Sequence, residues 1–367
     1  MTQESNEPVV VEKSRYRDKV IAAVAVVLVL SLVWFLYPSI KSSLQRMVNG
    51  GDKAIPFENL SGDIYLTLAL SGTKLADLYE YNLGTGNLKK TFSDEADNRL
   101  RLTAKLSPDA QQLAFVDTSI DPNSNFYYPS SEWFQLRVID KATGENTQIT
   151  NTEDPSKRLG DWSPDGTKIT YTAQVTDENF GGLDKQDFFY DTDKWVVFVV
   201  DVNSKVQKPI DRGTHPFWSP DGKKILYMKS DGLYLYDVSN DTKQLVLPTT
   251  ESFDATTNIK MDVSDDGSWL ALSLPAHRNI YLYKITSWER GIIEDKTKIE
   301  ASGSSIFWPV FSPDSRYLVF QEADIFPGAD AAANTRLSVY DLKAKSYREL
   351  MKLDGFNFDV AFISDWK

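Results

Sequence analysis

The chain has 367 residues, 41% of them hydrophobic and 12% aromatic, so it is long enough to bury a sizeable core. Its net charge of −12 argues against nucleic acid as a partner, because binding to phosphates requires clustered lysine and arginine. The absence of cysteine excludes disulfides, thiol catalysis and cysteine zinc sites. With only two histidines, His215 and His277, histidine-rich metal sites and histidine-based catalysis are disfavoured.

The N-terminal region predicts one membrane-spanning helix. Residues 1–19 are polar and hold four Lys or Arg between positions 13 and 19, and the seventeen residues 20–36 carry no charge. Trp34 and Tyr37 end the apolar segment, where amphipathic rings favour the lipid headgroup level. A span of this length just crosses a bilayer core of roughly 30 Å. The alternative is a cleaved signal peptide, but the apolar run is long for one and no Ala-x-Ala site follows it.

The charges flanking this segment predict its orientation. Four Lys or Arg precede the span, and three (Lys41, Arg46 and Lys53) follow it, which favours an N-terminus inside the cell. We therefore expect a cytoplasmic tail at 1–19, an uncleaved signal-anchor helix at 20–37, a stalk at 38–55 and an extracytoplasmic domain at 56–367. This assigns the protein to the cell membrane as a single-pass protein.

A tetrapeptide related to Ser-Pro-Asp-Gly recurs five times. The copies begin at Ser107, Ser163, Ser219, Ser264 and Ser312. Subtracting successive numbers gives spacings of 56, 56, 45 and 48 residues. A turn that recurs at this interval between short strands is typical of a β-propeller.

The strand pattern predicts six four-stranded antiparallel blades. Six alternating apolar segments, from Leu78–Asn82 to Leu337–Asp341, have the pattern of a third strand, but only five turns occur. The segment 62–92 begins at a second strand, and 358–367 resembles a first strand, with Ser364-Asp365 aligned to the repeat as a sixth copy. We predict that the C-terminal segment completes this blade and closes the ring, which removes exposed sheet edges.

The aspartates of the five turns are interpreted as structural. Proline presets φ at the second turn position, the aspartate bonds nearby backbone N–H groups, and glycine tolerates the last position. The residues so assigned are Asp109, Asp165, Asp221, Asp266 and Asp314.

Two copies, Trp162 to Gly166 and Trp218 to Gly222, read Trp-Ser-Pro-Asp-Gly in full. These motifs resemble the TolB-type propeller family with its WD-like repeats, and the likeness covers roughly residues 56–367. The resemblance implies a closed six-bladed fold and a protein-interaction role in the cell envelope. The chain differs from that family in carrying an apolar helix instead of an N-terminal α/β domain. We also expect no hydrolase domain of the kind that follows similar propellers in prolyl-type peptidases, so we do not transfer the family's partners.

The lengths of the loops indicate a candidate binding face. Loops between the second and third strands are short in the fourth and fifth blades but long at 117–132, 174–194 and 321–335. Long loops in a compact repeat are usually functional. They hold twelve acids and two bases, interleaved with aromatics. The candidate binding residues are Phe126, Tyr127, Tyr128, Asp184, Asp187, Phe188, Phe189, Tyr190, Asp191 and Phe326. A solvated acidic rim with its aromatics packed on the sheet is an equally weighted alternative.

Other candidate sites rest on weaker patterns. Oxygens at 121–125 and 184–193 would suit calcium but lack EF-hand spacing, so we expect neither a metal nor a cofactor. Asp161, Asp262 and Asp359 fall in first strands and are candidates for carboxylates lining the central channel. No nucleophile elbow, phosphate-binding loop or zinc-protease motif is present.

These observations favour a membrane-anchored module that binds a protein, peptide or glycan in the cell envelope and is not an enzyme. The alternative is a propeller hydrolase or lyase that uses channel carboxylates, with or without calcium. A third hypothesis is an architectural subunit of a larger complex, for which an apolar patch on a blade edge would be the signature.

Overall fold

The computed structural model describes residues 60–69, 76–92, 99–119, 134–151, 156–174, 195–248, 260–274, 279–300, 305–324, 333–353, 356 and 362–367. The predicted transmembrane helix at 20–37 lies outside these ranges. Within them, the structure contains no helix that is long and apolar enough to cross a membrane.

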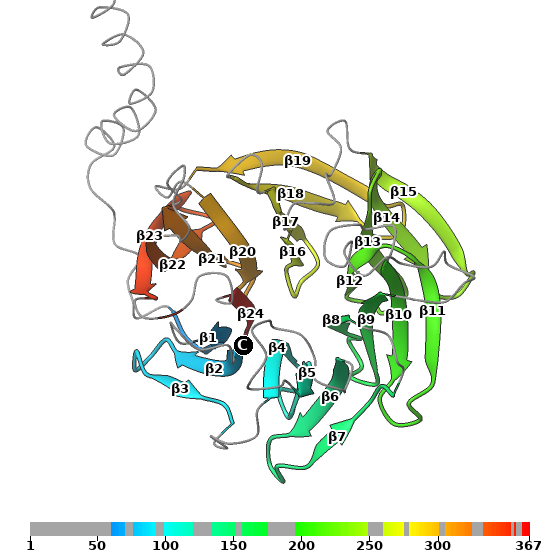
Figure 1. Cartoon of the computed structure of the whole chain (residues 1–367). Coiled ribbons are helices and arrows are strands. Elements are labelled where there is room, and N and C mark those ends of the chain that lie inside the picture. Colours follow the sequence, from blue (N-terminus) through cyan, green and yellow to red (C-terminus); the bar gives the residue numbers. More distant parts are fainter. Residues whose placement is uncertain are drawn as a thin grey trace, which may run out of the picture. The chain divides into compact units, whose positions relative to one another are not determined.

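The described residues form an all-β ring of six four-stranded antiparallel sheets, as the repeats predict (Figure 1). Each sheet is one blade, and its four strands are called first to fourth from the channel outward, while the labels β1 to β24 follow the chain. The innermost strands of blades 1 to 6 are β24 (Phe362–Trp366), β4 (Arg99–Leu106), β8 (Lys157–Trp162), β12 (Thr214–Trp218), β16 (Lys260–Val263) and β20 (Ser305–Phe311). The second strands are β1 (Asp63–Ala69), β5 (Gln112–Ser119), β9 (Lys168–Gln174), β13 (Lys224–Lys229), β17 (Trp269–Leu274) and β21 (Tyr317–Asp324).

The two outer strands of each blade follow in the same order. The third strands are β2 (Ala76–Asn82), β6 (Gln135–Asp140), β10 (Trp195–Asp201), β14 (Gly232–Asp237), β18 (Asn279–Ser287) and β22 (Ala333–Asp341). The outermost strands are β3 (Leu88–Lys90), β7 (Asn146–Gln148), β11 (Gln207–Arg212), β15 (Thr242–Pro248), β19 (Ile292–Ile299) and β23 (Ser346–Lys352). Buried side chains such as Phe115, Tyr171, Tyr227 and Phe320 form the core between neighbouring sheets.

The C-terminal strand closes the ring, as predicted from the repeat count. β24 pairs antiparallel with β1 and becomes the innermost strand of blade 1. Trp366 is buried, its ring stacks against Tyr317 of blade 6, and its indole N–H donates to the carbonyl of Ser61. Closure therefore joins segments separated by about three hundred residues without leaving a free inner edge.

The alignment of Ser364-Asp365 with the turn serine and aspartate is wrong by three residues. The backbone N–H of Lys367 donates to the carbonyl of Asp63 at 3.0 Å, as that of Ser163 does to the carbonyl of Lys168 at 2.8 Å. Lys367 therefore takes the place of the turn serine, and Trp366 takes that of Trp162. Asp365 consequently belongs to the inner strand and not to a turn.

The Ser-Pro-Asp-Gly turns are held by hydrogen bonds within five residues. In blade 3 the hydroxyl of Ser163 donates to Asp165 at 2.6 Å and accepts from the N–H of Lys168 at 2.9 Å. Asp165 also accepts from the N–H of Thr167, and these bonds lower the pKa of Asp165 to about 2. The fourth turn position is left-handed in every copy, with φ between 56° and 69° at Ala110, Gly166, Gly222, Gly267 and Ser315.

Candidate functional site

The ten predicted loop-face residues lie outside the described ranges. They are Phe126, Tyr127, Tyr128, Asp184, Asp187, Phe188, Phe189, Tyr190, Asp191 and Phe326. The oxygen-rich segments 121–125 and 184–193, together with His277 and Asp359, also lie outside them. The loop-face hypothesis therefore stays a prediction, and the described site is the channel between the innermost strands.

Three acids counted with the long loops belong instead to strand ends and pair with arginine. Asp117 is 1% exposed and lies 2.6 Å from Nε of Arg99 and 2.8 Å from Nε of Arg137. Glu322 is fully buried, 2.9 Å from Arg336, and Asp324 lies 3.9 Å from the same guanidinium. These ion pairs neutralise part of the negative charge expected on the loop face.

Three aspartates occupy equivalent positions on alternate blades. Asp161 and Asp262 stand two residues before a turn serine, and Asp365 stands two before Lys367, on blades 3, 5 and 1. Each carboxylate accepts a hydrogen bond from a backbone N–H on the innermost strand of the next blade. The bonds run from Trp218 to Asp161 (3.4 Å), from Phe311 to Asp262 (2.8 Å) and from Leu106 to Asp365 (2.8 Å). The carboxylates thus link the blades in pairs around the ring.

Lys105 occupies the corresponding position on blade 2 and crosses the channel. Its Nζ lies 3.4 Å from Oδ1 of Asp262 on the opposite blade and 3.7 Å from Oδ1 of Asp161. The same Nζ lies 5.0 Å from the ring centroid of Phe217. The side chains of Lys105 and Asp161 are 18% and 26% exposed, so water reaches this level of the channel. We call Lys105, Asp161, Asp262 and Asp365 the acidic cluster.

Burial and charge act in opposite directions on the pKa values of this cluster. Burial raises the pKa of Asp262 to about 6 against the attraction of Lys105, and burial likewise raises the pKa of Asp161 and of Asp365. Burial lowers the pKa of Lys105, but the carboxylates outweigh it, and the net pKa of this lysine is raised. Lys105 is attracted by four carboxylates, those of Asp262, Asp161, Asp365 and Asp265. Lys367 adds a second positive charge near Asp161 and Asp365, but burial still outweighs the attraction on these two aspartates.

The opposite end of the innermost strands is basic. Arg158 on β8 pairs with Thr172, and Lys260 on β16 pairs with Ser273, each nine residues beyond its own turn serine (172 − 163 and 273 − 264). The two cations therefore lie at one level, on the side of the ring from which the second-to-third-strand loops emerge. His215 lies between them on β12, in a left-handed bulge with φ of 52°. We call Arg158, His215 and Lys260 the basic cluster.

Lys260 carries a buried amine without a counter-ion among the described residues. The residue is 9% exposed, and its Nζ lies 4.0 Å from the ring centroid of Trp308 on β20. Within the described ranges its side chain makes no hydrogen bond and no ion pair. Burial and the charge of Arg158 lower the pKa of Lys260 well below its usual range. Burial, Lys260 and Arg158 lower the pKa of His215, whose Nδ1 lies 3.0 Å from the hydroxyl of Thr214.

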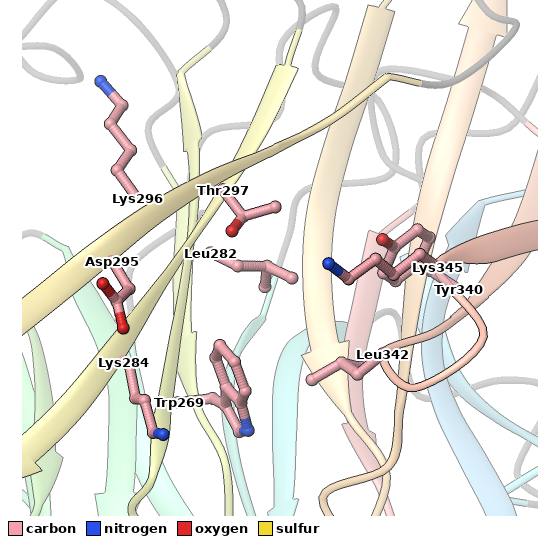
Figure 2. A pocket seen from close by; sticks show the side chains of 9 residues that line it. All are labelled: Trp269, Leu282, Lys284, Asp295, Lys296, Thr297, Tyr340, Leu342 and Lys345. Carbon is pink, nitrogen blue, oxygen red and sulfur yellow. The ribbon is translucent and has the colours of Figure 1, made fainter.

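A cleft of about 390 Å³ lies away from the channel, between blades 5 and 6 (Figure 2). Trp269 and Leu282 form one wall, and Tyr340 and Leu342 form the other. Its charged rim consists of Lys284, Asp295, Lys296 and Lys345, all of them exposed. These are solvated surface charges, in contrast to the enclosed groups of the channel.

The described residues do not meet the requirements of a metal site. No group of three or more Asp, Glu, His or Cys among them is placed to hold a metal ion. The carboxylates of the acidic cluster point their oxygens at backbone N–H groups and at Lys105, which is the arrangement of a structural tie. Of the sequence candidates, Asp161 and Asp262 do meet in the channel, while Asp359 lies outside the described ranges.

Sequence reasoning missed Lys105, Lys260 and Asp365. Lys105 and Asp365 could have been found from the repeat alignment, since both occupy the position of Asp161 two residues before the turn position. The three-residue error at Ser364 concealed Asp365. No sequence signal distinguishes Lys260 from the other lysines that begin a strand.

No protein-family model and no curated protein matches the chain. TolB from Acinetobacter baumannii has a similar structure, with a TM-score of 0.57 and 18% identity over 83% of this chain and 67% of that one. A chain of a nidogen/laminin complex gives a TM-score of 0.51 at 9% identity, over 82% and 97%. An oligogalacturonate lyase in complex with manganese gives 0.49 at 15%, over 79% and 78%. At these identities, the likeness to the first two structures shows a shared fold and nothing further.

Proposed function

We propose that the protein is a membrane-anchored, extracytoplasmic β-propeller that binds a protein, peptide or glycan through its loop face, and that it is not an enzyme. The observation that carries this proposal is the engagement of the acidic cluster. Its carboxylates accept backbone N–H bonds from neighbouring blades and share Lys105, so they serve the ring. What then distinguishes the molecule from a plain propeller is the set of long loops at one end.

Binding is tested by using the full chain to capture its envelope partners. Alanine at Phe188, Phe189 and Tyr190 removes three aromatic side chains from the longest loop, and we expect it to abolish recovery of envelope partners. The matched control is Val206→Ser, in the 66% exposed turn between β10 and β11 on the opposite face. Equal recovery by both variants would place binding elsewhere.

Because the chain has no cysteine, the anchor and its orientation can be tested with single introduced thiols. Val206→Cys creates a unique thiol on the propeller, and Glu4→Cys creates one on the tail. A membrane-impermeant maleimide is expected to label the first in intact spheroplasts and the second only after lysis. The reverse pattern would contradict the proposed orientation, and release of the chain by alkaline extraction would contradict the anchor.

A second candidate, a hydrolase or lyase, is favoured by the pKa of about 6 at Asp262, because acid–base catalysis requires a group poised near neutrality. Its test is the turnover of envelope glycans by the wild-type chain and by Asp262→Asn. Turnover that is lost in this variant would replace the binding proposal.

A further inference from the structure

The basic cluster combines features that a propeller scaffold does not require. Arg158, His215, Lys260 and Trp308 come from the innermost strands of four consecutive blades, 3 to 6. None of these side chains stabilises a turn. None accepts a backbone N–H bond from the next blade, as the carboxylates of the acidic cluster do. A buried amine without an acceptor is costly, because it loses its hydration and gains only the face of an aromatic ring.

The charged group that acts on Lys260 among the described residues is another cation, Arg158. Arg158 stacks over Trp195 with its guanidinium carbon 4.3 Å from the ring centroid. Lys260 and Arg158 are the charged groups that act on His215. No carboxylate opposes Lys260 or His215 within the described ranges. When Nδ1 of His215 accepts from Thr214, its Nε2 carries a proton and is a second donor.

We propose that this end of the channel binds a carboxylate-bearing ligand, with the ammonium of Lys260 as its counter-ion, the ring N–H of His215 as a second donor and Trp308 as an aromatic wall. This site is independent of the loop-face proposal, because it is built from inner strands. Its ligand enters from the loop side, since the carboxylates of the acidic cluster repel an anion at the other end.

The aromatic surface beside Lys260 favours a carboxylate with an apolar body over inorganic phosphate. Arg158 is stacked on Trp195, whereas Lys260 lies over Trp308, so Lys260 is the cation that stands beside the proposed aromatic wall. An aromatic ring 4.0 Å from the ammonium also suits a ligand with an apolar body attached to its carboxylate. Inorganic phosphate has no apolar body and gains nothing from that ring.

Binding at this site is coupled to proton uptake. Without an anion, burial and Arg158 favour the neutral amine of Lys260. A bound carboxylate favours the ammonium, so the ligand and one proton bind together. Where free Lys260 is neutral, the affinity is therefore expected to fall about tenfold for each unit of pH increase.

The test is calorimetric titration of the full chain with benzoate at pH 8.5, in two buffers of different ionisation enthalpy. We expect binding with uptake of close to one proton, and a loss of affinity of about tenfold or more in Lys260→Met. Lys284→Met, at the exposed rim of the cleft in Figure 2, is the matched control and is expected to bind as the wild type does. Inorganic phosphate is expected to bind more weakly than benzoate.

A spectroscopic measurement on the wild-type chain keeps the test independent of how Lys260→Met folds. In a chain labelled with ¹³C at lysine Cε, benzoate is expected to move the Lys260 signal from the neutral to the charged position. Absence of that shift, benzoate binding without proton uptake, or unchanged binding in Lys260→Met would overturn the site. Tighter binding of phosphate than of benzoate would overturn the carboxylate assignment.

Discussion

The two ends of the central channel use charge in opposite ways. At the turn end, each carboxylate of the acidic cluster has a backbone N–H from the next blade, and Lys105 lies within 3.7 Å of two of them. At the loop end, Lys260 has only the face of Trp308. Charges that are fully engaged hold the ring together, whereas a charge left without a partner marks a place where something else can bind.

The largest effect is expected where the ring closes. Trp366→Ala removes a buried indole that packs on Tyr317 and bonds to Ser61, and it is expected to lower the free energy of unfolding by about 4 kcal/mol. Chemical denaturation measures this value. Trp269→Ala, on the half-buried wall of the open cleft, is the matched control and is expected to cost less than half as much. Equal costs would mean that closure adds nothing beyond ordinary burial.

A pair of lysine variants tests the contrast between the two ends directly. Lys105→Met removes the cation that pairs with Asp161 and Asp262 and is expected to cost about 3 kcal/mol. Lys260→Met replaces a buried amine that has no acceptor by an apolar chain of similar length, and is expected to leave stability unchanged or raised. Comparable losses in both variants, measured by denaturation, would remove the distinction between the ends.

A smaller effect is expected at the turns. Ser163→Ala removes a buried hydroxyl that donates to Asp165 and accepts from the N–H of Lys168, at a cost of about 1.5 kcal/mol. The exposed Ser204, which donates to Asp201 in an outer turn, provides the control Ser204→Ala, expected to change stability only slightly. A turn serine that proves equally dispensable would contradict its proposed structural role.

The smallest effect is a pH dependence at the acidic end. The pKa of Asp262 is about 6 in the folded chain and about 3.8 when unfolded, so between these values the folded state binds the extra proton. The contribution of Asp262 to the free energy of unfolding is therefore highest below pH 4 and is lost as the pH rises through 6. Lowering the pH from 7 to 5 is expected to add about 1 kcal/mol. Asp262→Asn is expected to remove this gain in the free energy of unfolding. If the variant shows the same dependence of stability on pH, the gain belongs to other groups.

Much of the fold could be predicted because it follows from signals within a few residues. The Ser-Pro-Asp-Gly turns repeat at blade intervals, and the surplus third strand implied a closing segment at the C-terminus. The exact register of that segment could not be predicted, because β24 ends in Trp366-Lys367 and lacks the serine that marks the other turns. The roles of Asp117 and Glu322 were misread for a related reason, since their arginine partners lie on neighbouring strands and not beside them in sequence.

The sequence by itself determined the number of blades, their turns and the strand that closes them, because turn chemistry acts between residues at most five apart. Only the tertiary structure decided which charges meet. Lys105, Asp262 and Asp365 are separated by more than a hundred residues, and Arg158 and Lys260 are likewise distant until six inner strands converge on one axis. Burial at that axis then determines which of these groups is paired and which is left for a ligand.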